Sequence, residues 1–239
     1  MTDVTRTGRI AWRSVPLLAL GLLAGLPSGA VGQEAAMTAA LAPHFVRVTP
    51  GATTPDSDGF LRRWLFLEPI DKPNRSNSGF TGTYVRQALT TQYFPGQFGP
   101  VPRDGQTVAA AAPLRWHALD STAFDVKLFD FARAFGKPTY GVIFWAVTVV
   151  DSPREMRDVR LAVGSNSASM WWLNGKEIVG LFNDRRMVVD DVLSDRLTLR
   201  KGRNVIRGAV INGPGLSDFC ARFVDANGRP ITDLKVDVR

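Results

Sequence analysis

Residues 165–180, SNSASMWWLNGKEIVG, place two adjacent tryptophans just before an Asn174-Gly175 pair. Asn-Gly is a strong β-hairpin signal, because a type I′ turn needs positive φ at both of its central residues. Neighbouring residues of a strand point to opposite faces, so Trp171 and Trp172 cannot share one side of a sheet. We expect Trp171, on the same face as Leu173, to enter the core and Trp172 to lie on the outer face.

The segments on both sides of this hairpin have the same character. YGVIFWAVTVV (140–150), MRDVRLAVG (156–164) and LTLRKGRNVIRGAVING (197–213) are rich in β-branched and apolar residues and are separated by turn residues. FLRRWLFLEPI (60–70) reads as an earlier strand that is ended by Pro69. Many short strands at regular turn spacing predict an all-β sandwich.

Residues 71–113 interrupt this regular pattern and are expected to form a helix and loop insertion. TGTYVRQALTTQYF (81–94) carries Val85, Leu89 and Tyr93 at helical spacing, with Thr81 or Thr83 as a possible N-cap. Further along, FDVKLFDFARAFGKP (124–138) suits a strand followed by a short helical turn.

The N-terminus has the pattern of an export signal. Residues 1–32 contain three arginines, a short apolar run and then small residues at a cleavage-like site. We expect a signal peptide over 1–32, a loosely ordered segment over 33–59 and a β-sandwich domain over 60–239. A retained membrane anchor is the alternative reading, whereas cleavage would leave a periplasmic or secreted protein without a stable membrane anchor.

Charge and cysteine content narrow the function classes. The formal net charge is +7, but the arginines are scattered, so we expect no nucleic-acid partner. Cys220 is the single cysteine, which excludes an internal disulfide. Its neighbours Phe219 and Phe223 predict a buried, inert thiol in a strand.

Signatures of catalysis are weak. His44 and His117 are the two histidines, no GxSxG motif accompanies them, and a structural His117 is the favoured reading. Asp190 and Asp191 would point to opposite faces of a strand, so they cannot flank one glycosidic bond. The sequence offers no zinc ligand spacing, and we expect no metal or cofactor apart from a possible structural calcium.

Aromatic and amide side chains are the better lead. Sugar sites combine an aromatic ring for the apolar face of a pyranose with planar polar groups that bind its hydroxyls. On this basis the predicted ligand-binding residues are Trp172, Asn166, Arg185 and Asn212. The competing interpretation is that Trp172 only covers a sheet face.

Several quoted stretches carry a family resemblance. LAVGSNSASMWWLNGKEIV, LTLRKGRNVIRGAVING, LSDFCARFVDANGRPI and RRWLFLEPI together resemble the galactose-binding-like jelly-roll modules that accompany polysaccharide-degrading enzymes. The resemblance covers about two-thirds of the mature chain and concerns fold more than function. Residues 71–113 depart from the simple module, which leaves the position of a binding face open.

The resemblance implies a non-catalytic carbohydrate-binding jelly roll, an accessory to polysaccharide degradation, with a poly- or oligosaccharide as partner. It also extends to secreted proteins of an acetylxylan-esterase-like type. A carbohydrate esterase and a structural or protein-interaction sandwich therefore stay open as alternatives, and the sequence specifies no oligomeric state.

Overall fold

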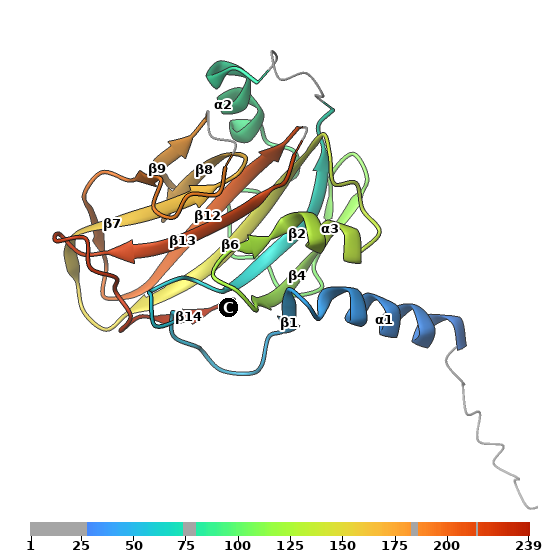
Figure 1. Ribbon diagram of the computed structural model, residues 1–239, viewed down its shortest axis with the longest axis horizontal. Coiled ribbons are helices and arrows are strands. Elements are labelled where there is room, and N and C mark those ends of the chain that lie inside the picture. Colours follow the sequence, from blue (N-terminus) through green and yellow to red (C-terminus); the bar gives the residue numbers. More distant parts are fainter. Residues whose placement is uncertain (1–27, 74–79, 183–185, 214) are drawn as a thin grey trace, which may run out of the picture.

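The computed structural model describes residues 28–73, 80–182, 186–213 and 215–239. Within these ranges the chain forms two antiparallel sheets that pack face to face, with three short helices at the margins (Figure 1). The chain crosses repeatedly between the two sheets, as a jelly roll does. The predicted all-β jelly-roll sandwich is confirmed.

The larger sheet holds the longest strands. In spatial order it contains β1 (Phe45–Arg47), β4 (Pro113–Ser121), β2 (Arg63–Asp71), β6 (Val142–Ser152), β12 (Gly202–Asn212), β8 (Ala168–Leu173) and β9 (Lys176–Leu181). Two short strands join it at the side, β14 (Lys235–Asp237) next to β6 and β3 (Thr107–Ala109) next to β4. β6 and β12 pair along their whole length and form the centre of this sheet.

The smaller sheet faces one side of the larger one. It contains β10 (Val192–Leu193), β7 (Met156–Ser165), β13 (Asp218–Val224) and β5 (Val126–Lys127), with β11 (Leu197–Leu199) also paired to β7. Below, the inner face of the larger sheet is the one that packs against this smaller sheet, and the outer face is the opposite one.

The opening stretch folds as its pattern predicts. β8 and β9 form a hairpin whose turn residues Asn174 and Gly175 have φ values of 51° and 85°. Both angles are positive, as a type I′ turn requires. Trp171 and Trp172 lie on opposite faces of β8, which confirms the predicted split between the two rings.

The inner core forms around Trp171. Its ring is fully buried and meets Trp64 and Phe219 edge to face, with centroid distances of 6.0 and 5.0 Å. Gly208 lies opposite Trp171 on β12, and a Cβ there would come within 2.4 Å of the indole ring. Glycine is therefore needed at 208 to make room for the tryptophan. Cys220 is also buried, on the face of β13 opposite Phe219 and Phe223, and burial raises the pKa of its thiol to about 11, as expected for an inert cysteine.

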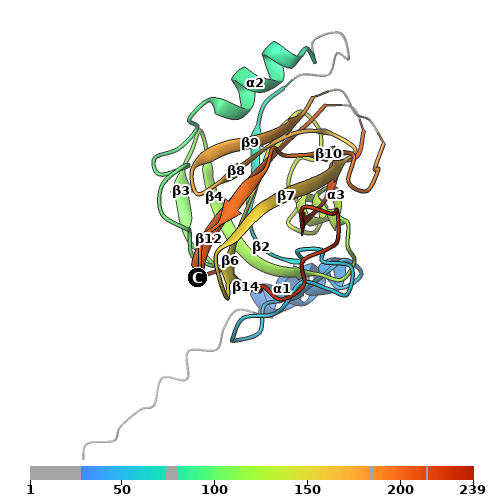
Figure 2. The same cartoon turned by 90° about the vertical axis from the view of Figure 1, so that its left-hand side faces the viewer.

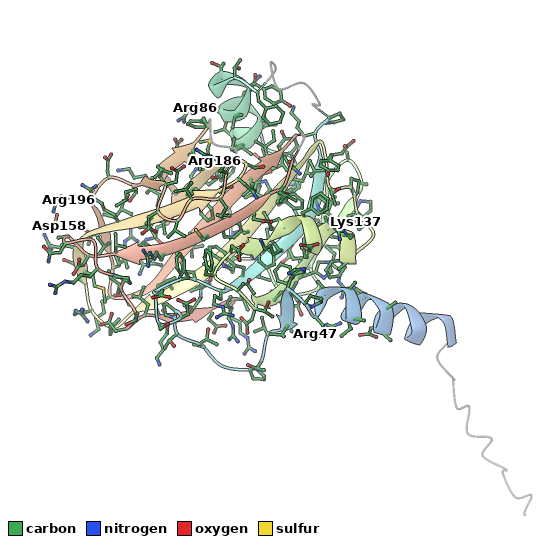
Figure 3. The ribbon with its side chains drawn as sticks, viewed as in Figure 1. Arg47, Arg86, Lys137, Asp158, Arg186 and Arg196 are labelled. Atoms are coloured by element: carbon green, nitrogen blue, oxygen red, sulfur yellow. The ribbon has the colours of Figure 1, made fainter. Side chains whose placement is uncertain are left out.

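The insertion covers the outer face. α2 (Gly82–Thr90) packs Val85 and Leu89 onto that face, and β3, paired with β4 at the side of the larger sheet, adds Val108 to the same cluster (Figure 2). Thr81 caps α2, accepting a hydrogen bond from the backbone N–H of Tyr84 at 3.1 Å. The predicted short helix is thus confirmed, and it lies over a second hydrophobic core. Arg86 of α2, labelled in Figure 3, forms an ion pair with Glu177 of β9 at 2.8 Å.

Pro69 does not end its strand, contrary to the prediction. β2 continues to Asp71, and its pairing with β6 shifts register between Leu67 and Ile70. A proline is tolerated at such an irregularity because no ladder hydrogen bond needs its missing N–H.

The segment expected to be loosely ordered contains regular structure. α1 (Ser28–Leu41) reaches into it, and β1 pairs with β4. Leu41 and Phe45 are buried in the inner core, which explains why this part of the chain is ordered.

α3 (Leu128–Ala134) follows β5, as predicted for that stretch. Residues 1–27 lie outside the described part of the chain, so the signal peptide stays a prediction. Among the described residues, no helix has the length and apolar character to cross a membrane.

Candidate functional site

Trp172 lies on the outer face but is not an open platform. Its side chain is only 5% exposed. The ring stacks on Trp145 with centroids 5.4 Å apart and planes 20° from parallel, and Phe98 meets it edge-on at 5.5 Å. The protein's own aromatic side chains therefore cover the surface that was expected to receive a sugar.

Asn166 and Asn212 both hold the connection between β12 and β13. Asn166 Oδ1 accepts a hydrogen bond from the backbone N–H of Asp218 at 2.6 Å. Asn212 Nδ2 donates to the carbonyl oxygens of Thr139 at 2.6 Å and Gly215 at 3.1 Å. Arg185 lies outside the described residues. The structure thus gives the two asparagines positions in a turn region and Trp172 a position in a core, and it does not bring these three residues to one site.

A long loop of the insertion, residues 94–106, creates the concave surface of the outer face. Its last residues pair with the edge of β4: Gly105 N–H donates to Trp116 O at 2.8 Å, and Trp116 N–H donates to Gln106 O at 2.9 Å. Gly105 has φ of 75°, a conformation that glycine adopts without strain. The side chain of Gln97 fixes the start of the loop by bonding the backbone of Tyr93 and Thr91.

One concavity under this loop is named here the Trp116 cavity. Its volume is about 640 Å³. It is lined by Phe94, Pro95, Gly96, Gln97, Pro100, Val101, Pro102, Arg103, Asp104, Gly105, Gln106, Val108, Trp116 and Val147. The buried members, among them Phe94, Val108, Trp116 and Val147, form an apolar floor, and the exposed polar members form a rim.

Trp116 has an unusual environment for a buried tryptophan. It is 3% exposed, and Phe94 packs against its ring edge-on at 6.4 Å. Its indole Nε1 is buried and has no hydrogen-bond partner among the described residues. Buried tryptophan N–H groups normally find a partner, so this free donor is a feature that needs an explanation.

The rim keeps polar atoms available for a ligand. Asp104 Oδ1 accepts from the backbone N–H of Ala118 at 2.8 Å, and Gln106 Oε1 accepts from the backbone N–H of Arg103 at 3.0 Å. These bonds fix both side chains to the backbone. They leave Asp104 Oδ2 and Gln106 Nε2 without hydrogen-bond partners within the described ranges. An apolar aromatic floor with a few fixed polar groups suits a small ligand that has both apolar faces and hydroxyl groups.

His117, the next residue of β4, points to the other face. Its Nε2 lies 3.3 Å from Glu68 Oε1, and its ring packs against that of Phe135 with centroids 3.9 Å apart and planes tilted by 35°. Glu68 also accepts from Arg115 N–H at 3.2 Å and from Lys137 Nζ at 3.0 Å; Figure 3 labels Lys137. With two other donors on this carboxylate, His117 Nε2 is assigned as a third.

The environment of His117 shifts the pKa of its imidazole. Burial lowers the pKa of the imidazole, and the hydrogen bond to Glu68 opposes that effect without cancelling it. A cavity of about 450 Å³ borders this cluster between α1 and β4, and its described lining contains no serine, threonine or cysteine. A nucleophile for a Ser-His-acid triad is therefore not among the residues that line this cavity.

The sequence does not predict the cavity around Trp116, because residues 71–113 depart from the regular strand pattern. The signal that was present is the alternation of LRWHAL (114–119), which sends Trp116 and His117 to opposite faces. No local pattern, however, states that the 94–106 loop folds back over Trp116. Among the described residues no group of three or more His, Cys, Asp or Glu side chains gathers as a metal site would require.

Comparisons with known proteins give weak similarity. No family model matches the sequence, and no curated protein matches it significantly. Among solved structures, a PA14 sugar-binding domain from an RTX adhesin is 10% identical with a TM-score of 0.37, covering 73% of this chain and 96% of that domain. A β-glucosidase from Kluyveromyces marxianus, also solved in complex with glucose, is 15–16% identical with a TM-score of 0.36 over 68% of this chain. This chain spans 16% of the length of that enzyme. At such identities and TM-scores these similarities carry no argument about function.

Proposed function

We propose that this protein is an exported, non-catalytic carbohydrate-binding β-sandwich whose ligand occupies the Trp116 cavity. The observation that carries the proposal is the unpartnered, buried indole N–H of Trp116, a residue of the apolar floor of a cavity with a polar rim. A sugar hydroxyl would accept this hydrogen bond, and the apolar face of the ring would lie on the floor. Export and an accessory role in polysaccharide degradation rest on the leader-like sequence and the family resemblance.

The rim suits a sugar better than a purely apolar ligand. Asp104 can accept hydrogen bonds from hydroxyl groups, while Gln106 and Arg103 can donate to them. Because Asp104 and Gln106 are already held by the backbone, little side-chain entropy would be lost on binding. The exposed position of this rim leaves room for further units of an oligosaccharide.

Binding should first be sought by screening the protein against a panel of neutral and acidic glycans. Trp116→Phe then removes the N–H donor and keeps an aromatic ring at the floor. Loss of one hydrogen bond of about 0.5–1.5 kcal/mol predicts a Kd that rises about 2- to 12-fold in calorimetry. Asp104→Asn, which keeps the size of the side chain, should also weaken binding.

Trp145→Phe is a matched control. Its indole Nε1 is likewise buried without a partner among the described residues, but Trp145 does not line the Trp116 cavity. This variant should bind glycan like the parent protein. Glycan binding that is equal in the parent, Trp116→Phe and Trp145→Phe would remove the cavity from the proposal, and absence of any glycan ligand would overturn the function.

A further inference from the structure

Arg207 is a buried cation with little to neutralise it. It lies on β12, is 4% exposed, and is paired across the ladder with Trp172. Its Nη2 donates to the carbonyl oxygen of Gly99, and its Nε has no partner among the described residues. Burial lowers the pKa of the guanidinium, and no described acidic side chain counteracts this effect.

This arrangement is unfavourable for the fold alone. Buried charges are normally paired with an opposite charge, because removing an ion from water is costly and a single carbonyl oxygen compensates only part of that cost. An apolar residue of similar length would pack between Trp172 and the 94–106 loop without this penalty. The position of Arg207 therefore calls for a reason other than stability.

A cavity of about 470 Å³ lies beside this guanidinium. It is bordered by the 94–106 loop at residues 98–101, by the β8–β9 turn at Asn174 and Gly175, and by Arg203, Val205 and Arg207 of β12. Alternation along β12 places Arg203 on the same face as Arg207. Within the described residues this lining contains two arginines and no aspartate or glutamate.

Arg203 is the second cation of this cavity and is more accessible. It is exposed, and its Nη1 donates to the backbone oxygen of Arg239. Two guanidinium groups on one strand face give an oxyanion more than one donor pair, and guanidinium binds carboxylate and sulfate oxygens in a bidentate way. A ligand with a negative oxygen group would supply the charge that Arg207 lacks.

The Arg207 cavity and the Trp116 cavity adjoin the same loop. Pro100 and Val101 line both of them. One glycan lying along the 94–106 loop could therefore present a hydroxylated ring to Trp116 and an acidic group to Arg207. We propose that Arg207 and Arg203 bind the acidic group of an anionic glycan, a uronate carboxylate or a sugar sulfate. This inference rests on the proposed function.

The experiment compares three ligands: a uronic acid oligosaccharide, the same oligosaccharide with its carboxyl groups reduced to alcohols, and a sulfated oligosaccharide. Calorimetry on the full chain measures the three Kd values. At least one acidic oligosaccharide should have a Kd about tenfold or more below that of the carboxyl-reduced oligosaccharide. The two acidic ligands show which oxyanion the site takes. Added salt should narrow the difference, since the interaction is between charges.

Arg207→Met is the decisive variant, because methionine keeps much of the length and removes the charge. It should abolish the preference for acidic over neutral ligand without lowering the Tm. Arg196→Met is the matched control: Arg196 is an exposed arginine paired with Asp158 at 3.5 Å, away from the loop (Figure 3). It should leave the preference unchanged. If Arg207→Met does not fold, Arg207→Lys should still reduce the preference, because an ammonium lacks the planar fork.

The outcomes separate this inference from the proposed function. Equal affinity for acidic and neutral ligands in the parent, or a preference that persists in Arg207→Met, overturns the anion site while leaving sugar binding at Trp116 intact. If no glycan binds, free inorganic sulfate is tested by thermal shift. A Tm rise that is lost in Arg207→Met would uphold the anion site and reject the glycan function, and no Tm rise in the parent would reject both.

Discussion

The inner core lies between the two sheets, and a second core, called the outer core, lies between the larger sheet and the insertion. The two contain similar residues but differ in whether their buried polar atoms have hydrogen-bond partners. In the inner core, Trp64 donates its indole N–H to Leu61 O at 2.8 Å, and Trp171 donates to Ser169 Oγ at 3.1 Å. On the outer face, the indole N–H groups of Trp116 and Trp145 and the Nε of Arg207 have no partners within the described ranges.

The two faces of the larger sheet therefore differ in whether their buried donors are paired. The inner core is enclosed between two hydrogen-bonded sheets, and the indole N–H groups of its two tryptophans have partners. The outer core is closed by the insertion, whose 94–106 loop leaves cavities next to unpaired donors. Of the five buried side-chain atoms without partners among the described residues, three lie on the outer face, and the other two, Asn212 Oδ1 and Ser217 Oγ, lie beside the β12–β13 connection. Unsatisfied buried groups reduce stability, so the three donors of the outer face support binding there.

The largest predicted effect compares the two adjacent tryptophans. Trp171→Ala should lower the free energy of unfolding by about 4–5 kcal/mol, because the ring is enclosed by two sheets that cannot collapse onto the gap. Trp172→Ala should cost about 2–3 kcal/mol, because the loop residue Phe98, 37% exposed, can move into the space. Urea denaturation of both variants measures the difference, and equal losses would show that the outer core is as rigid as the inner one.

A smaller effect is expected at Gly208. An alanine Cβ would lie 2.4 Å from the Trp171 ring, so Gly208→Ala should destabilise the fold by about 1–3 kcal/mol through overpacking. Combining it with Trp171→Leu should recover part of this loss, because the ring that clashes is gone. Combining it with Trp172→Leu, on the other face, should give additive losses. Coupling of Gly208 to Trp172 instead of Trp171 would contradict the assignment of faces.

The sequence predicted the inner core well and the outer core poorly. Alternation and turn residues are local signals, so the β8–β9 hairpin, the two faces of β8 and the α2 helix could be read directly. The docking of the 94–106 loop onto Trp116 and Trp172 depends on contacts between segments distant in sequence, which no periodicity encodes. The same limit explains why the sequence predicts Trp172 as a sugar platform and does not single out Trp116 or Arg207.

The smallest effect concerns the neighbours Trp116 and His117, which extend the comparison of faces to β4. Because burial lowers the pKa of His117, the unfolded chain binds more protons than the folded one as the pH falls below about 6.5. The stability contributed by neutral His117 is therefore complete above that pH and is lost as the pH falls towards the folded-state pKa. In His117→Gln the new side chain cannot titrate but can still donate to Glu68, so the Tm of this variant should fall less than that of the parent between pH 7 and pH 5.

The glycan affinity of His117→Gln at pH 7 should equal that of the parent, whereas Trp116→Phe should keep the parent's pH dependence of Tm and bind more weakly. Parallel Tm curves for the parent and His117→Gln, or weakened binding in His117→Gln, would show that the two faces of β4 are not divided between stability and binding.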